Sequence, residues 1–406
     1  MNVLLLDGDQ NQAVACTRSL ARAGHTVCVG GPSSWSKAAW SSCCSKSFIY
    51  SAPEQDAQAF VHDIVRALKT ARGSFVLPLT ERTTLPISSN RDAILEAGGV
   101  VVLPPQDVVL RAFDKLETTR LAQSLGVFVP RTVLVENESQ AEQAASDFLY
   151  PAVLKPRSSE RLFGGRIQST GAPHYASNAG EFCQAWREIS RRADGILAQE
   201  YIQGAGEGYF ALMHHGEPRA EFAHRRIRDV RPTGSGSAVR VSTRAKAELR
   251  EAGMAILRAL GWHGVAMVEF RVRPDSKPVF MEVNGRFWNS LALAVYAGAD
   301  FPALLAHMAE HGDVDCPPPY REGVRCRWLL GDFRHLGAVW RGIPRGYSGK
   351  YPGRLRTTLD FLTPVPGTYH DNFELRDPLP ELGDWLDFFF RRIPAELKKR
   401  RSQREG

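Results

Sequence analysis

Residues 264–286, with the sequence GVAMVEFRVRPDSKPVFMEVNGR, are the most informative segment of the chain. Two apolar runs flank the turn-forming residues 274–277, which predicts two antiparallel strands joined by a hairpin turn. All facing pairs on one side are apolar, as expected for a hairpin with one buried face. With Asp275 and Ser276 at the centre of the turn, the predicted pairs are Val272 with Val279, Phe270 with Met281, and Val268 with Val283.

The same register places two glutamates opposite each other on the other face of the hairpin. Glu269 faces Glu282, and Asn284 lies on the same face. Facing residues have Cβ atoms about 5 Å apart, and like charges so placed destabilise a sheet. A Mg²⁺ ion would compensate, because it prefers oxygen ligands and commonly binds one or two carboxylates together with substrate phosphates. Two alternatives stay open: both glutamates point into water, or Arg271 and Arg286 neutralise them.

The first third of the chain alternates short apolar runs with helical patterns. This alternation predicts a parallel, doubly wound α/β sheet. The turn after the first strand, DGDQN at 7–11, lacks the G-x-G-x-x-G fingerprint of a dinucleotide site, and its two acidic side chains would repel a phosphate. A scaffold or substrate-binding wall is therefore expected, and a nicotinamide oxidoreductase is disfavoured. Strands are predicted at 3–6, 26–29, 48–50, 75–79 and 100–103, and helices at 11–23, 57–70 and 84–97.

Two later segments carry residues suited to a nucleotide. Lys155 ends an apolar strand at 151–156, and a Ser- and Gly-rich loop follows it. A fixed positive charge beside free backbone N–H groups suits a polyphosphate. The segment QEYIQ at 199–203 leads into a glycine-rich bend before Glu207, and such a bend can offer a backbone edge and a carboxylate to adenine and ribose. Each signal alone is weak, because many strands end in lysine and many such bends are solvated loops.

Composition places the chain among globular proteins of more than one domain. It has 406 residues, of which 43% are hydrophobic and 23% charged. No stretch approaches the ~20 apolar residues of a membrane helix, and the short apolar run at 3–6 has no basic segment before it, so no secretory signal is expected. The seven cysteines are scattered without metal-ligand spacing, which predicts reduced thiols in a cytoplasm.

Most of the net charge of +7 lies at the C-terminus. Residues 391–406 contain seven basic and two acidic side chains, so the rest of the chain is close to neutral. A solvated basic terminus is the expected interpretation. A weak contact between this tail and a membrane surface stays open, because the tail follows the apolar segment 385–390. No nucleic-acid partner is expected.

Taken in order, the motifs resemble those of the ATP-grasp superfamily. The likeness is to the carbamoyl-phosphate-synthase-like carboxylate–amine ligases and their amino-acid and peptide ligase relatives, and it extends from about residue 1 to residue 312. Several motifs in one order are far more specific than any single motif. They are DGDQNQAVACTRSLARAGHTV at 7–27, FDKLETTRLAQSLGVFVPRT at 113–132, AVLKP at 152–156, QEYIQGAGEG at 199–208, VEF at 268–270 and MEVNGRFWNS at 281–290.

The resemblance implies a three-part organisation. An N-terminal doubly wound α/β domain, the Rossmann-like pre-ATP-grasp domain, would occupy residues 1–111. An α+β ATP-grasp domain of two lobes would occupy residues 112–312. Residues 313–406 would form a C-terminal extension that includes the basic tail.

The resemblance also implies which residues bind the nucleotide. Lys115 and Lys155 would contact the phosphates of ATP, and Glu200 would take the adenine amino group. Tyr201 and Ile202 would supply the backbone edge beside the ring. Glu207 would hold the ribose.

For the metal and the chemistry, the resemblance implies a second set of residues. Glu269, Glu282 and Asn284 match ligands of Mg²⁺, with Mn²⁺ as a substitute. Arg286 would act in catalysis together with Lys155, by steadying the transferring phosphoryl group or the substrate carboxylate with its planar guanidinium.

Two segments depart from the family pattern. Gly285 stands where relatives commonly have proline, so the loop that holds Arg286 is expected to be less constrained. Residues 225–237 contain four arginines where many relatives have a glycine-rich loop near the reacting phosphate. An anionic substrate or the triphosphate could engage these arginines, and a solvated basic strand is the alternative.

The implied activity is that of an ADP-forming ligase. The γ-phosphoryl group would pass to a small-molecule carboxylate, and an amine or thiol would attack the resulting acyl phosphate. An ATP-dependent kinase or carbamoyl-phosphate-type phosphotransferase would share the same ATP residues. A non-catalytic nucleotide-binding module is the remaining alternative.

Overall fold

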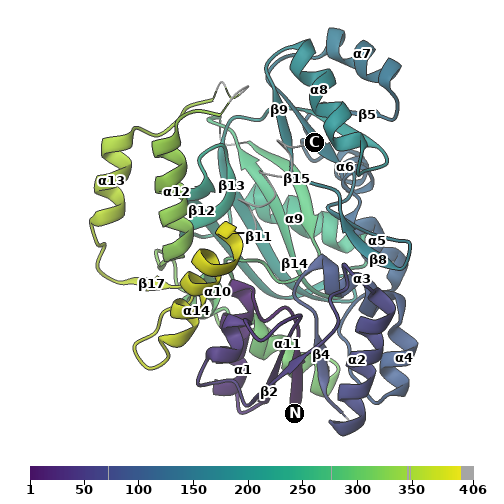
Figure 1. Cartoon of the computed structure of the whole chain (residues 1–406), viewed down its shortest axis with the longest axis vertical. Coiled ribbons are helices and arrows are strands. Elements are labelled where there is room, and N and C mark those ends of the chain that lie inside the picture. Colours follow the sequence, from purple (N-terminus) through teal and green to yellow (C-terminus); the bar gives the residue numbers. More distant parts are fainter. Residues whose placement is uncertain (72, 276, 345–346, 348, 395–406) are drawn as a thin grey trace.

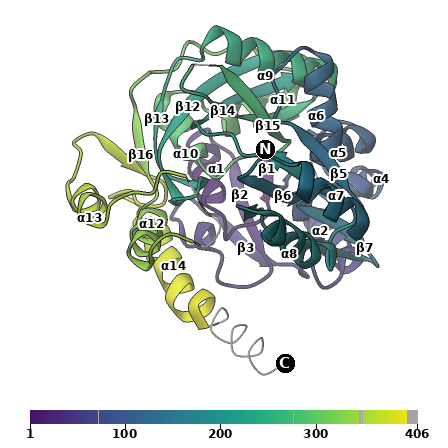
Figure 2. The same cartoon turned by 90° about the horizontal axis from the view of Figure 1, so that it is seen from above.

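The computed structural model describes residues 1–71, 73–275, 277–344, 347 and 349–394. Three sheets organise these residues, together with one separate hairpin. In Figure 1 the N-terminal domain lies at the bottom, a small lobe carrying α7 and α8 lies at the top, and a large lobe connects them. Figure 2 shows α12, α13 and α14 gathered on one side of the molecule, away from the small lobe.

The N-terminal domain is the parallel α/β sheet that the sequence predicts. Its strands pair in parallel in the order β3-β2-β1-β4. The strands are β1 (Asn2–Leu5), β2 (Thr26–Gly31), β3 (Lys46–Ile49) and β4 (Phe75–Leu77), and the helices are α1 (Asn11–Arg22), α2 (Ala57–Thr70), α3 (Glu81–Ser89) and α4 (Arg91–Glu96).

Two details of this domain differ from prediction. The helix predicted at 84–97 is two helices, because Asn90 leaves the helical conformation between α3 and α4. The strand predicted at 100–103 is reduced to one isolated bridge between Val100 and Phe75.

Asp7 has a structural role in the N-terminal domain, since its carboxylate accepts hydrogen bonds from the Leu79 amide at 3.0 Å and the Thr83 hydroxyl at 2.6 Å.

The small lobe is built on an antiparallel sheet of order β5-β10-β6-β9. Two helices lead into it, and the second is preceded by Asp114, whose side chain caps the amides of Leu116 and Glu117. The helices are α5 (Gln106–Phe113), α6 (Lys115–Ser124), α7 (Glu138–Asp147) and α8 (Ala179–Ser190), and the strands are β5 (Thr132–Val135), β6 (Ala152–Pro156), β9 (His174–Ala176) and β10 (Ile196–Glu200), with β7 (Glu160–Phe163) and β8 (Arg166–Ser169) forming the separate hairpin.

The large lobe contains a seven-stranded sheet of order β15-β14-β11-β12-β13-β16-β17. One face, with Tyr209 and Phe270, packs against α9, while the other, with Phe210 and Met267, shares a core with α10, α11 and the N-terminal domain. The elements are β11 (Ala205–His214), β12 (Glu217–Arg231), β13 (Ser235–Ser242), α9 (Ala247–Ala259), β14 (Gly264–Val272), β15 (Pro278–Asn284), α10 (Leu291–Ala297), α11 (Phe301–His311), β16 (Arg325–Arg327) and β17 (Thr368–His370).

The β14–β15 hairpin confirms the predicted pairs around the glutamates and corrects the others. Val268 faces Val283 and Glu269 faces Glu282, as predicted. Beyond Glu269 the predicted register was wrong: Phe270 faces Phe280 rather than Met281, and Val272 faces Pro278 rather than Val279. A β-bulge after Glu269 causes the shift, because Met281 is an extra residue on β15.

The C-terminal residues pack on both the large lobe and the N-terminal domain. β16 and β17 extend the large sheet. Between these two strands lie α12 (Leu329–Arg341) and α13 (Arg354–Leu362), and after β17 come α14 (Leu379–Asp387) and the short π-helical turn η2 (Phe388–Arg392). The predicted basic tail is described only at Arg391 and Arg392, which both pair with Asp387. Its remaining basic residues lie outside the described residues.

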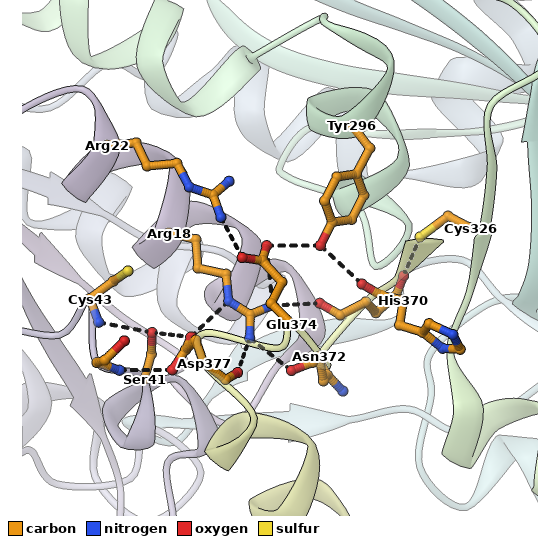
Figure 3. A network of polar contacts seen from close by, with 12 residues as sticks. Arg18, Arg22, Ser41, Cys43, Tyr296, Cys326, His370, Asn372, Glu374 and Asp377 are labelled. Carbon is orange, nitrogen blue, oxygen red and sulfur yellow. Dashed lines mark hydrogen bonds and ion pairs between the residues drawn. The ribbon is translucent and has the colours of Figure 1, made fainter. Parts of the chain in front are cut away.

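A network of buried polar contacts ties this C-terminal segment to α1, and Figure 3 shows it from close by. The Arg18 guanidinium donates to the Asp377 carboxylate at 2.8 Å and to the Asn372 carbonyl at 2.8 Å. Tyr296 of α10 donates to Glu374 at 2.9 Å. We call residues 371–387, with the N-terminal side chains that they contact, the C-terminal junction.

In the described part of the chain, no single helix is long and apolar enough to cross a membrane. α10 and α11 meet that length and composition only as a pair, and the pair is bent by 87°. All seven cysteines lie among the described residues and are free thiols.

Candidate active site

A cavity of about 360 Å³ lies between the small and large lobes. Its walls come from β6 and β10 on one side and from β12, β14 and β15 on the other. A volume of this size falls in the range of roughly 300–1,000 Å³ that is usual for small-molecule sites. Every site residue predicted from the sequence lines this cavity except Glu207. They are Lys115, Lys155, Glu200, Tyr201, Ile202, Glu269, Glu282, Asn284 and Arg286.

The hairpin presents an oxygen-rich group to the cavity. Asn284 links its neighbours, because its amide nitrogen donates to Glu282 Oε1 at 3.3 Å and its amide oxygen accepts from Arg286 at 2.7 Å. Burial alone would raise the pKa of Glu282, but the positive charges of Lys115 and Lys155 hold it below its ordinary value. Glu282 is therefore a carboxylate at neutral pH.

Two lysines face this group from the small-lobe side. Lys155 is buried, and its Nζ lies 3.4 Å from the carbonyl oxygen of Met281. Burial lowers the pKa of Lys155 to about 8, and the neighbouring Glu282 partly offsets this effect. Lys115, the first residue of α6, donates to the Ser159 hydroxyl at 2.8 Å. Neither lysine has an ion pair within 4.0 Å in the described part of the chain, so both charges are available to an anionic ligand.

Arg226 is a member of the site that the sequence analysis did not single out. It lies on β12, and its guanidinium contacts Glu269 Oε2 at 2.8 Å and Asp229 Oδ1 at 3.6 Å. Arg271, which was considered as a neutralising partner, instead donates to the carbonyl oxygens of Gly204 and Gly234. Charge neutralisation of Glu269 thus comes from β12, which is separated from β14 by β11, and one of the four arginines at 225–237 is part of the cavity wall.

Aromatic side chains close one end of the cavity. The ring of Tyr201 lies 6.0 Å from that of Tyr175 and 6.3 Å from that of Tyr347, both edge to face. Glu200 accepts a hydrogen bond from the Arg131 amide at 3.3 Å. Tyr347 belongs to the C-terminal extension, so this extension contacts a wall of the cavity. The sequence carries no signal for that contact.

Glu207 lies on the opposite face of the sheet from the cavity. Its neighbour Gly208 pairs with Glu269, and successive residues of a strand point to opposite faces. Glu207 is buried there, with Lys246 Nζ at 3.3 Å from its carboxylate. The geometry therefore gives no support to the assignment of Glu207 to the ribose.

The loop around Gly285 is held by packing. A Cβ at this position would lie 2.2 Å from Cη2 of the buried Trp262 ring, so only glycine fits. Arg286 is aimed by two hydrogen bonds, to the Asn284 side chain and to the Phe287 carbonyl at 3.0 Å. The expectation of a less constrained loop was wrong, because the indole of Trp262 takes the place that a side chain at 285 would need.

His224 and Ser290 form a buried pair at the cavity wall. The His224 Nε2 and the Ser290 hydroxyl lie 2.8 Å apart. Burial lowers the pKa of His224 well below its usual value, and Arg226 adds to this effect. His224 is thus a neutral core histidine.

The donor set suits a divalent cation together with a polyphosphate. Facing carboxylates and an amide oxygen are hard ligands of the kind that Mg²⁺ prefers. The cations around them match the charge of phosphate groups. This fit rests on Glu269, Glu282 and Asn284 on one side and on Lys115 and Lys155 on the other.

Comparison with known proteins agrees with this geometry. A family model described as "ATP-grasp in the biosynthetic pathway with Ter operon" matches residues 196–331, which include β10 to β15 and the hairpin glutamates. Over these residues, about a third of its length, the chain is similar to ATP-grasp proteins. Its N-terminal parallel sheet and mixed α/β lobes agree with that fold.

Two curated ATP-grasp relatives show what kinds of protein the chain resembles. A formate-dependent phosphoribosylglycinamide formyltransferase of Ignicoccus hospitalis is 24% identical over 55% of this chain and 56% of that protein. A D-alanine–D-alanine ligase of Nitrosospira multiformis is 26% identical over 48% of this chain and 65% of that protein. The chain covers less than two thirds of the length of either relative.

A solved structure supports the fold over a longer stretch. The biotin carboxylase domain of the Hydrogenobacter thermophilus 2-oxoglutarate carboxylase, in complex with MgADP, ADP and bicarbonate, superposes with a TM-score of 0.62. The match covers 80% of this chain and 73% of that domain at 14% sequence identity. At this identity the likeness concerns the fold alone.

Proposed function

We propose that this ATP-grasp protein is a Mg²⁺-dependent ligase that uses ATP to join a small carboxylic acid to an amine or a thiol. The observation that carries the proposal is the cavity in which unpaired Lys115 and Lys155 face Glu269 and Glu282. Unpaired cations attract a polyphosphate, and facing carboxylates attract the cation that accompanies it. The free cysteines support a cytoplasmic location for such an enzyme.

The nucleotide would lie between the two lobes. Lys155 and Lys115 would bind phosphate oxygens, and the end lined by Glu200, Tyr201 and Ile202 would hold the adenine. Bound at Glu269, Glu282 and Asn284, Mg²⁺ would neutralise charge on the phosphates, and Mn²⁺ could take its place.

The chemistry would proceed in two steps. A carboxylate oxygen of the acid attacks the γ-phosphorus, and the bond to the β-phosphate oxygen breaks, which gives an acyl phosphate and ADP. The amine then attacks the acyl carbon, phosphate leaves with the bonding electron pair, and the ammonium proton passes to solvent or phosphate. Arg286 would orient the carboxylate and stabilise the charge of the transferring group.

The cavity gives little support to a covalent enzyme intermediate. The only serine–histidine pair on its described wall is Ser290 with His224, and the lowered pKa of His224 makes it a weak base. Nδ1 of His224 is buried without a hydrogen-bond partner, so no third group orients the ring. The activated species would therefore be an acyl phosphate that is bound but not attached to the protein.

Trapping with hydroxylamine tests the proposal. The protein would be incubated with ATP, Mg²⁺ and a panel of carboxylic acids, and ADP release would be measured with and without amines. We expect ADP release to require one acid, and hydroxylamine to convert that acid to its hydroxamate. Ser290→Ala should still form the hydroxamate, because no acyl group is carried on that serine.

Two outcomes would overturn the proposal. Cleavage of ATP to AMP and pyrophosphate would indicate an adenylate intermediate. Release of ADP with an alcohol substrate and without hydroxamate would indicate the kinase alternative.

A further inference from the structure

Three histidines meet at the end of the large sheet that lies away from the cavity. They are His214, His215 and His263, and one ring nitrogen from each lies within 4.8 Å of the other two. His214 ends β11, six residues after Gly208, which pairs with the cavity residue Glu269. At roughly 3.4 Å per strand residue, the cluster is about 20 Å from that part of the cavity. It is thus separate from the site described above.

The pairing of β11 with β14 brings the histidines together. Met213 faces Gly264, so His214 and His263 are the next facing positions along the two segments. His215 and Gly216 then form the two-residue turn to β12, and the Gly216 amide donates to the Trp262 carbonyl at 2.8 Å. Two chain segments that are distant in sequence therefore meet with imidazoles on both.

His215 adopts a conformation that is unusual for its residue type. Its φ is 47°, and that of Gly216 is 88°. Two-residue hairpin turns with positive φ at both positions strongly favour Asn-Gly or Asp-Gly, so a histidine here carries backbone strain. Strain of this kind is often retained where the side chain has a function.

The ring nitrogens are arranged as in many metal sites. Asp313 and Arg219 lie 3.4 Å and 3.3 Å from Nδ1 of His214, so Nε2 is the nitrogen that would bind a metal. A carboxylate on the far nitrogen of a metal-binding histidine is a common arrangement, because it fixes the tautomer. Nδ1 of His263 is buried and has no hydrogen-bond partner, a state that is rare for a buried polar atom.

We propose that His214, His215 and His263 bind one divalent transition-metal ion of the Zn²⁺ class, with water as the fourth ligand. Zn–N bonds are about 2.0–2.1 Å long, so ligand nitrogens of a tetrahedral site lie about 3.4 Å apart. The ring of His215 now stacks on His263 at 4.2 Å, and because His215 is exposed it can turn to close the remaining gap. Imidazole selects transition metals over Mg²⁺, so this site and the carboxylate hairpin take different ions.

The test uses Co²⁺ as a spectroscopic substitute for Zn²⁺ on the full chain. The chelator-treated protein would be titrated with Co²⁺ in the presence of excess Mg²⁺, and the visible absorption of four-coordinate Co²⁺ would be recorded. We expect one equivalent of Co²⁺ to bind and Zn²⁺ to displace it. This readout does not depend on any catalytic activity, so its failure leaves the proposed ligase function untouched.

Variants assign the signal to the cluster. His215→Asn should weaken Co²⁺ binding at least tenfold while preserving the turn, because Asn tolerates positive φ. His263→Gln should act similarly. His62→Gln, which changes an exposed histidine of α2, and Glu282→Gln should both leave the Co²⁺ spectrum unchanged.

Three results would overturn this inference. The first is the absence of four-coordinate Co²⁺ absorption at one equivalent. The second is unchanged affinity in both His215→Asn and His263→Gln. The third is loss of the signal in Glu282→Gln, which would place the bound ion in the cavity instead.

Discussion

The C-terminal junction and the active-site cavity both contain buried charges, but they satisfy them differently. At the junction, Arg18 pairs with Asp377 and with backbone carbonyls, and Lys37 pairs with Asp384 at 2.8 Å. In the cavity, Lys155 has only a carbonyl oxygen at 3.4 Å among the described residues. The chain itself thus supplies partners for Arg18 and Lys37 at the junction, whereas a ligand is needed to pair the lysines of the cavity.

This difference separates a stabilising role from a binding role. A buried ion pair with all its hydrogen bonds made resists rearrangement, and removing one partner leaves an uncompensated charge. A lysine that is desolvated but unpaired has already lost much of its hydration when an anion arrives. Changes at the junction should therefore act on stability, and changes in the cavity should act on turnover.

The largest expected effect is on stability, at the junction. Arg18→Ala should lower the free energy of unfolding by about 3–5 kcal/mol, because it leaves the buried Asp377 without its cation. Urea denaturation followed by fluorescence would measure the change. Arg22→Ala is the matched control, since this side chain is 51% exposed and pairs with Glu374 at the surface of the same network. Equal effects of the two substitutions would contradict the distinction between buried and exposed pairs.

The next effect is on turnover, in the cavity. Glu282→Gln should reduce ADP formation by about 10²–10³-fold, as for the loss of one charged group at a transition state, with unchanged unfolding. Glu269→Gln should act in the same direction. Glu207→Gln should retain most activity, because Glu207 lies on the other face of the sheet. A large loss in Glu207→Gln would restore the ribose assignment.

The pH dependence should reveal the lysine in the cavity. The pKa of Lys155 is about 8, so kcat/KM for ATP should fall as pH rises through 8, because the neutral amine binds phosphate poorly. Binding of ATP should move this loss to higher pH in kcat. Lys155→Arg would keep its charge and should abolish the inflection. A wild-type profile that is flat from pH 7 to 9 would contradict the assignment.

Lys155 should also make the stability of the fold depend on pH, and stability should rise with pH where kcat/KM falls. Its folded-state pKa of about 8 lies below the ordinary 10.5, so the unfolded chain binds more protons between these values. The contribution of Lys155 to the free energy of unfolding should therefore increase with pH across this window. Urea midpoints of the wild type and Lys155→Met at pH 7.5 and 9.5 would isolate this contribution.

The smallest effect on turnover should follow deletion of residues 395–406. These residues carry five of the basic side chains of the tail, which the sequence analysis interprets as a solvated terminus. ADP formation should stay within about twofold, as is usual for surface changes. Binding to anionic lipid vesicles, if present in the full chain, should weaken and lose its dependence on salt. Loss of turnover in a folded truncation would make the tail part of the active unit.

Alternation in the hairpin was enough to predict that Glu269 faces Glu282. The bulge could not be predicted, because Met281 is one more apolar residue in a segment that is already apolar. The face that Glu207 occupies could not be predicted from its motif, because successive residues of a strand point to opposite faces and the start of the strand was not known. The arginines at 225–237 were noted as a group, but the sequence did not show that Arg226 is the one that pairs with Glu269. The contact of Tyr347 with Tyr201 was missed because Tyr347 is distant from every motif in sequence.

The C-terminal junction also has a consequence for synthesis on the ribosome. The partner of Arg18 lies 359 residues later in the chain, which at 5–20 residues per second corresponds to a delay of about 20–70 s. During that time Arg18 and Lys37 have no acidic partner from the junction. We therefore expect nascent chains to need chaperones over this interval, and fragments that end before residue 371 to be recovered mainly as aggregates.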